Sequence, residues 1–168
     1  MIQTTLLPES EGGLRRIVSG GQTGVDRAAL EAALAAGLDC GGWCPRGRKA
    51  EDGAIGSRYP LQETPSDAYE QRTRWNVRDS DGTLVLTDGE PVGGTALTVE
   101  VARAWGRPLL IVDFNARPPA PAVHEWLRDN RIRVLNVAGP RESQSPGIQR
   151  RAYGYLQKLL DKARRPGT

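Results

Sequence analysis

The segment from Ser19 to Arg27 holds the residues best suited to bind an anion. It reads Ser-Gly-Gly-Gln-Thr-Gly-Val-Asp-Arg and lies between the apolar pair Ile17-Val18 and an alanine-rich helix pattern. Glycines let the backbone approach a phosphate closely, and the first N–H groups of a helix have no partner within the helix. The segment therefore predicts an anion site at a strand-to-helix junction, and a tight turn without a ligand is the alternative.

A second glycine-rich turn follows the apolar run 84–86. Residues 88–95 read Asp-Gly-Glu-Pro-Val-Gly-Gly-Thr and again open a helix pattern, so their free N–H groups form a second candidate anion site. Two such turns predict two phosphates, or one phosphate and one other polar group. After the last apolar run, Arg141 is a candidate anion clamp and Ser143 a candidate donor, unless Arg141 and Glu142 merely neutralise each other at the surface.

A basic loop and one helix face add side chains to these turns. Arg46 and Lys49 lie in the loop 44–53, where they either fold over a bound phosphate or are solvated. The predicted helix 66–78 has a polar face that consists of Tyr69, Arg72, Thr73 and Asn76. Because a face that packs on a sheet is normally apolar, we expect this face to border the ligand crevice.

The predicted binding residues thus come from several loops and one helix. They are Gly20, Gly21, Gln22, Thr23, Gly24, Asp26, Arg27, Arg46, Lys49, Asn76, Asp88, Gly93, Gly94, Thr95, Arg141 and Ser143. No structural metal is expected, because Cys40, Cys44 and the lone His124 cannot supply four zinc ligands. For the two cysteines, partly buried thiols are favoured over a disulfide.

Short aliphatic runs alternate with helix patterns along the chain. The runs are 17–18, 83–87, 109–113 and 132–137, of which 109–113 is expected to be fully buried, and the predicted helices are 26–36, 66–78, 94–105, 121–129 and 148–163. Ser66 is the expected N-cap of the second helix, and Gly37 the expected C-cap of the first. This alternation predicts an α/β fold with a doubly wound, mostly parallel five-stranded sheet and helices on both faces. In such folds, ligands bind at the carboxyl ends of the strands.

Length and charge narrow the class of protein. The 168 residues fit one domain, predicted over 15–164 after a tail at 1–14. The net charge of +3 is spread along the chain, so a nucleic-acid partner is not expected. No run approaches the roughly 20 apolar residues that span a bilayer, so we expect a cytoplasmic protein without a membrane partner. The sequence orders of P-loop kinases and of dinucleotide oxidoreductases are absent.

Six motifs together resemble the putative molybdenum carrier family, a branch of the Rossmann-like SLOG superfamily that is related to the YpsA and LOG proteins. The motifs are residues 19–27, 45–53, 72–73 with 76–77, 80–83, 93–95 and 139–143, within the span 16–160. The resemblance implies a Rossmann-like fold and a phosphate-bearing ligand, either the molybdenum cofactor or a nucleotide. It also implies a homo-oligomer, commonly a dimer or a tetramer.

The resemblance to LOG proteins implies an alternative function. LOG-type phosphoribohydrolases carry Pro-Gly-Gly-x-Gly-Thr-x-x-Glu, and residues 92–100 match its paired glycines and its final glutamate, Glu100. Ala96 and Leu97 stand where that pattern has Gly-Thr. The leading expectation is therefore a binding protein that needs no catalysis. The alternative is a nucleoside 5'-monophosphate phosphoribohydrolase in which Glu100 and Arg72 are catalytic.

Overall fold

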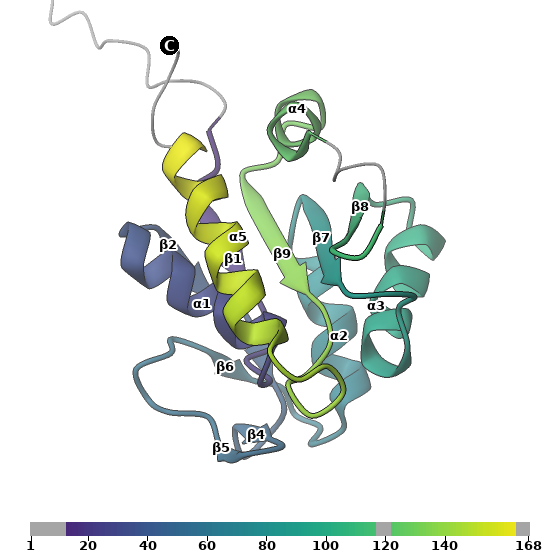
Figure 1. The fold of residues 1–168 in the computed structure, drawn as a ribbon. Coiled ribbons are helices and arrows are strands. Elements are labelled where there is room, and N and C mark those ends of the chain that lie inside the picture. Colours follow the sequence, from purple (N-terminus) through teal and green to yellow (C-terminus); the bar gives the residue numbers. More distant parts are fainter. Residues whose placement is uncertain (1–12, 117–121, 164–168) are drawn as a thin grey trace, which may run out of the picture.

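The computed structural model describes residues 13–116 and 122–163, and Figure 1 shows their arrangement. The predicted tail 1–14 lies outside the described residues except for Gly13 and Leu14. The first residue of the predicted helix 121–129 and the predicted domain end at 164 lie outside them as well.

A five-stranded parallel sheet forms the centre of the molecule. Its strands are β1 (Arg16–Val18), β2 (Asp39–Gly41), β7 (Gly82–Thr87), β8 (Leu109–Asp113) and β9 (Val134–Ala138), in the order β2-β1-β9-β7-β8. Every neighbouring pair in this sheet is parallel. The predicted α/β class with a mostly parallel five-stranded sheet is therefore confirmed.

In the part of the chain that the structure describes, five helices cover the sheet on both faces. They are α1 (Val25–Ala36), α2 (Tyr69–Arg78), α3 (Gly93–Ala104), α4 (Val123–Asp129) and α5 (Ile148–Ala163). Crossovers between parallel strands are right-handed, so connections that run toward opposite edges of a sheet place their helices on opposite faces. The chain runs from β1 to one edge and from β7 to the other, and accordingly α1 packs on α5 while α2 packs on α3 (Figure 1).

The local sequence explains how α1 meets the sheet. Its buried side includes Ala28, Ala29, Ala32 and Ala33, and these small side chains let the helix lie close to the strands. Gly37 ends the helix in the left-handed conformation, with φ of 68°, as the sequence predicts. The loop 19–24 joins the carboxyl end of β1 to the beginning of α1.

Two local predictions are wrong. Ser66 is not the N-cap of α2, because the helix begins at Tyr69 and the Ser66 hydroxyl instead accepts a hydrogen bond of 3.0 Å from the Ala68 N–H in the preceding turn. Strand β8 is not fully buried, because it lies at the edge of the sheet and most of its residues are only half-buried. The other helix bounds differ from the predicted ones by no more than two residues.

Residues 43–63 form two small sheets beside the main one. Strand β3 (Trp43–Cys44) pairs in parallel with β6 (Gln62–Glu63), and β4 (Lys49–Ala50) pairs with β5 (Gly53–Ala54) in an antiparallel hairpin. Four residues of the predicted basic loop 44–53, namely Cys44, Lys49, Ala50 and Gly53, therefore lie in these strands. Cys40 and Cys44 are buried free thiols, as expected, and burial raises the pKa of both.

The main core lies between the sheet and its helices. Leu84, Leu86, Leu135 and Val137 of the central strands are completely buried. Their neighbours across the core include Leu156 and Leu160 from α5. Within the described part of the chain, no helix is both long enough and apolar enough to cross a membrane.

Candidate functional site

The carboxyl ends of β1, β9 and β7 open into one cavity. Its volume is about 40 Å³, enough for a group the size of a few water molecules or one phosphoryl group. This is the point at which the chain turns from one edge of the sheet toward the other, where open α/β sheets bind their ligands. The cavity is lined by Gly20, Gln22, Asp26, Arg72, Thr73, Asn76, Gly94, Thr95, Thr98, Asn136, Val137, Ala138, Gly139, Arg141 and Gln144.

Gln22 brings an unused hydrogen-bond donor to this cavity. Its side chain is oriented by Oε1, which accepts hydrogen bonds from the N–H groups of Thr23 at 3.0 Å and Glu51 at 2.9 Å. Only 5% of the residue is exposed, and its Nε2 is buried with no hydrogen-bond partner among the described residues. Leaving a buried donor unsatisfied costs about 1–3 kcal/mol, so this donor, on a residue that lines the cavity, is a candidate partner for an acceptor on a ligand.

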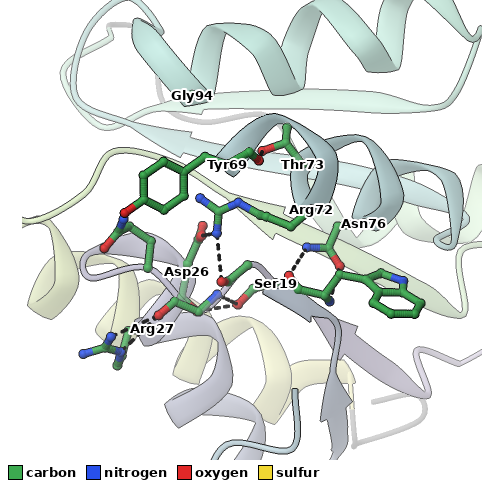
Figure 2. A network of polar contacts seen from close by, with 12 residues as sticks. Ser19, Asp26, Arg27, Tyr69, Arg72, Thr73, Asn76 and Gly94 are labelled. Atoms are coloured by element: carbon green, nitrogen blue, oxygen red, sulfur yellow. Dashed lines mark hydrogen bonds and ion pairs between the residues drawn. The ribbon is translucent and has the colours of Figure 1, made fainter. Parts of the chain in front are cut away.

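Arg72 brings a buried positive charge to the opposite wall. As Figure 2 shows, its guanidinium points from α2 toward the loop after β1, where Nη1 donates to the Gly20 carbonyl at 2.8 Å. A Cβ on Gly20 would lie 2.0 Å from that nitrogen. Gly20 is therefore required for the approach of Arg72 to the backbone.

Asp26 is the acidic residue in the cavity wall. Its Oδ2 lies 3.5 Å from Arg72 Nη1, and its side chain is 10% exposed. Burial raises the pKa of Asp26 to about 6, although Arg72, a backbone hydrogen bond from Gln22, Arg27 and Arg141 all act to lower it. Asp26 is thus a carboxyl group that titrates near neutral pH inside the candidate site.

Three cations surround the ring of Tyr69 beside the cavity. Lys49 Nζ lies 4.7 Å from the ring centroid, and the guanidinium carbons of Arg72 and Arg141 lie 5.2 and 5.4 Å from it. Such cation–π contacts hold positive charges in place without neutralising them. Arg141 also lies 3.9 Å from Glu51. This part of the site therefore has an excess of positive charge.

The beginning of α3 supplies backbone donors. Gly94 and Thr95 line the cavity, and within the described chain the N–H groups of Gly93 and Gly94 donate to no other group. A Cβ on Gly94 would have nothing within 4 Å, so the space beside this glycine is open. The positive end of the helix dipole adds to the attraction for an anion at this point.

The beginning of α1 is closed, in contrast to that of α3. The N–H groups of Gly21, Thr23 and Gly24 donate to Ser19 Oγ, Gln22 Oε1 and Gln149 Oε1. These amides are engaged within the protein. The loop after β1 therefore contributes to the cavity chiefly through the side chains of Gln22 and Asp26.

The β4–β5 hairpin fastens this closed loop. Glu51 accepts hydrogen bonds from Thr23 Oγ1, Ser143 Oγ and the Ser143 N–H, while Arg27 pairs with Asp52 at 2.6 Å and also donates to the Gly21 carbonyl. Burial pushes the pKa of Glu51 up, but the bonds from Ser143 and Thr23 and the nearby Arg141 bring it below its ordinary value. Thr23, Arg27 and Ser143 thus position the loops and do not line the cavity.

Other predicted residues have structural partners of their own. Asn76 lines the cavity, but its side-chain amide is bonded in both directions to the backbone of Trp43, at 2.8 and 2.9 Å. Arg46 donates to the Pro65 carbonyl at 3.1 Å, and Asp88 accepts a hydrogen bond from Ser145 Oγ.

Several predicted residues lie outside the cavity wall, including the predicted catalytic glutamate. Glu100 is exposed on α3, whereas Thr95 and Thr98 of the same helix face the cavity. The predicted residues that do not line the cavity are Gly21, Thr23, Gly24, Arg27, Arg46, Lys49, Asp88, Gly93, Glu100 and Ser143.

The polar side chains in the cavity wall that were not predicted from the sequence are Thr98, Asn136 and Gln144. Asn136 is the informative one, because it interrupts the apolar strand β9 and is only 3% exposed. Its Nδ2 donates to Thr83 Oγ1 on the neighbouring strand at 3.3 Å. A polar residue inside an apolar run was therefore a signal for this site. Among the described residues, no group of three or more His, Cys, Asp or Glu is placed to hold a metal ion.

Comparisons with known proteins agree with this architecture. The crystal structure of a putative molybdenum carrier protein from Syntrophus aciditrophicus SB superposes with a TM-score of 0.81, and its sequence is 38% identical. The match covers 89% of this chain and 96% of that one. No curated protein matches the chain. The model of the circularly permutated YpsA SLOG family matches residues 17–160. The chain therefore belongs to the circularly permutated YpsA SLOG family.

Proposed function

We propose that this protein binds a phosphate-bearing small ligand, either the molybdenum cofactor or a nucleotide, in the cavity at the carboxyl ends of β1, β9 and β7. The observation that carries the proposal is Gln22 Nε2, a buried donor without a partner among the described residues. It lines the cavity together with Arg72 and Arg141. The function requires binding and no catalysis.

The donors around the cavity fit the phosphate that both ligands carry. Gln22 Nε2 would bond one oxygen, Arg72 and Arg141 would balance the negative charge, and the N–H group of Gly94 would bond the oxygen nearest to α3. The cavity has room for one phosphate, so the remainder of the ligand would extend outward past Tyr69 and its cations.

The similarity to the Syntrophus protein supports the molybdenum cofactor as one of the two ligands, because that protein is named as a molybdenum carrier. A nucleotide is supported by the position of the cavity, where other open parallel sheets bind nucleotides. Native mass spectrometry of freshly purified protein, with elemental analysis for molybdenum, distinguishes the two. We expect an added mass that corresponds to a phosphorylated compound.

The variant Gln22→Glu tests the binding site directly. It keeps an oxygen to accept from Thr23 and Glu51, and it replaces the donor that faces the cavity with a carboxylate oxygen. We expect its affinity for adenosine monophosphate and for inorganic phosphate, measured by calorimetry, to fall at least about tenfold. Gln157→Glu makes the same change on the exposed side of α5 and is the matched control. Equal affinities in the two variants would contradict the proposal.

The hydrolase alternative is not favoured, because Glu100 lies outside the cavity. We therefore expect incubation with adenosine monophosphate to release no free base. Sustained release that is lost in Glu100→Ala would reverse this conclusion.

We further propose that the protein is a homo-oligomer, a dimer or a tetramer. The support is its resemblance to a family in which such assemblies are common.

A further inference from the structure

One acidic residue in the wall of this anion site needs an explanation. Among the residues that line the cavity, Asp26 is the one carboxyl group, and Gln22 and Arg72 line the same cavity. An ionised carboxylate repels an anion, so a site that has only to attract phosphate would gain affinity without it. Asp26 therefore has either a structural role or a role in recognising a particular kind of anion.

The contacts around Asp26 leave part of its carboxyl group without a partner among the described residues. Its partners are a backbone hydrogen bond from Gln22 and Arg72 Nη1, which gives its short hydrogen bond, 2.8 Å, to the Gly20 carbonyl and lies 3.5 Å from Asp26 Oδ2. This ion pair is loose although both side chains are 10% exposed. An ionised carboxylate has about four positions for accepting hydrogen bonds. Asp26, which lines the cavity, thus keeps capacity to accept a hydrogen bond from a group there.

We propose that the cavity selects an oxyanion that carries a proton, such as monohydrogen phosphate, over tetrahedral dianions without one, such as sulfate and molybdate. The proposal rests on the proposed function and names the ionic form that this site takes, which for a phosphate monoester is the monoanion, because the fully ionised monoester has no P–OH group. Gln22 Nε2 and Arg72 donate to the bare oxygens of the anion, and the P–OH group of the anion donates to Asp26. Sulfate and molybdate offer no such donor, so they would place a bare oxygen against a carboxylate.

The charge state of Asp26 makes this selectivity dependent on pH. The charged groups that face its carboxyl are Arg72 from α2, Arg27 from α1 and Arg141 from the loop after β9. Burial outweighs them and raises the pKa of Asp26 to about 6. At pH 7.5 the group is ionised and can only accept, whereas at pH 5 about nine-tenths of it is protonated and can donate to a bare oxygen.

The experiment is calorimetric titration of the full chain with inorganic phosphate, sodium sulfate and sodium molybdate at pH 7.5. We expect phosphate to bind at least about tenfold more tightly than the other two ions. A difference of this size is typical when one buried hydrogen-bonding group, here the Asp26 carboxylate, is left without a partner. In Asp26→Asn, the side-chain NH₂ can donate where the carboxylate only accepted. This variant should bind sulfate and phosphate with affinities within about threefold of each other.

The affinity of the unaltered chain for sulfate at two pH values is a second test. It needs no variant, so it does not depend on whether Asp26→Asn folds. Sulfate does not titrate between pH 7.5 and 5, so a change in its affinity over this range reports on the protein. We expect sulfate to bind at least about fivefold more tightly to the unaltered chain at pH 5 than at pH 7.5.

The outcomes separate this inference from the proposed function. Equal binding of phosphate, sulfate and molybdate at pH 7.5, or sulfate affinity that is the same at both pH values, would overturn the selectivity and leave the oxyanion site intact. If none of the three ions bound at either pH, the oxyanion site itself would be refuted, and the selectivity with it.

Discussion

Within the described ranges, the side-chain amide of Gln22 has hydrogen-bond partners at Oε1 and none at Nε2. The backbone N–H groups of Thr23 and Glu51 hold Oε1, so the buried Nε2 is aimed by contacts that do not involve a ligand. A donor positioned in advance loses little conformational entropy on binding. Gln22 therefore links the glycine loop after β1 and the β4–β5 hairpin to the chemistry of the cavity.

Gly24 is needed for close packing rather than for contact with a ligand. Its φ is 81°, and a Cβ there would lie 2.2 Å from the Pro140 carbonyl oxygen. Gly24→Ala should lower the free energy of unfolding by about 2 kcal/mol or more, because the cost of the positive φ and the cost of the steric clash with Pro140 add up. Gly47→Ala is the matched control, since Gly47 has a φ of 84° and open space around it. Equal losses in the two variants, measured by chemical denaturation, would show that the close approach to Pro140 is not important.

Asp26 should reduce stability above pH 6. Its pKa is raised from 3.8 to about 6 on folding, so the unfolded chain loses this proton first as the pH rises. The contribution of Asp26 to the free energy of unfolding therefore decreases as the pH rises from 3.8 to about 6, and it stays low above pH 6. The variant Asp26→Asn should be the more stable protein at pH 7.5, by about 1–3 kcal/mol, and this advantage should shrink toward pH 4.

Denaturant unfolding of both proteins across this pH range is the measurement. A difference between them that does not change with pH would mean that the pKa of Asp26 is not raised.

At the scale of residues, the sequence indicated the two glycine turns and the polar face of α2 because these patterns are local. It did not indicate that the amides of Gly21, Thr23 and Gly24 are consumed by partners within the protein. One of those partners, Gln149, lies 125 positions away along the chain. Contacts of this kind depend on the packing of α5 against α1, which no local pattern contains.

The β4–β5 hairpin is the element that closes over the glycine loop. Its attachments are the bonds of Glu51 to Thr23 and Ser143 and the ion pair between Arg27 and Asp52. Because the pKa of Glu51 is lowered below 4.5 on folding, its contribution is present above that value and is lost as the pH falls further. The hairpin is thus fastened at neutral pH and loosens in acid.

Hydrogen exchange tests this attachment. In Glu51→Gln, the Ile55 N–H, which donates to the Arg48 carbonyl at 2.7 Å, should exchange roughly tenfold faster at neutral pH. Glu125→Gln, an exposed change on α4, should leave that rate as it is. Equal exchange at Ile55 in both variants would mean that Glu51 does not hold the hairpin.

At the scale of elements, prediction succeeded where periodicity was strong. The apolar residues of α5 recur at helical spacing, and both ends of this helix, Ile148 and Ala163, were predicted correctly. The aliphatic runs of β7 and β9 likewise predicted two strands that the structure contains. The strands β2 to β6 have only two or three residues each and little apolar character, so they had no detectable period. The burial of strand β8 was predicted wrongly, because the local sequence does not indicate which strand lies at the edge of the sheet.

At the scale of the whole molecule, the alternation of strands and helices was enough to predict a parallel sheet with two covered faces. The insertion of β9 between β1 and β7 follows from pairings distant in sequence, such as Ile17 with Leu135. That insertion brings the glycine turns after β1 and β7 to opposite sides of one cavity. Their convergence therefore depends on the topology of the complete chain.

The proposed assembly is also a property of the whole molecule. Light scattering coupled to gel filtration should give two or four times the chain mass of 18.2 kDa. A mass of one chain at micromolar concentration would contradict the proposed dimer or tetramer.

The most direct measurement for the central claim is the side-chain amide resonance of Gln22 in ¹⁵N-labelled protein during titration with inorganic phosphate. If phosphate binds in this cavity, the Gln22 Nε2 signal and the Gly94 N–H signal should shift together and saturate at one phosphate per chain, while the side-chain amide of Gln157 stays in place. A titration in which Gln22 and Gly94 do not move, or in which Gln157 moves as much as they do, would contradict a phosphate site in this cavity.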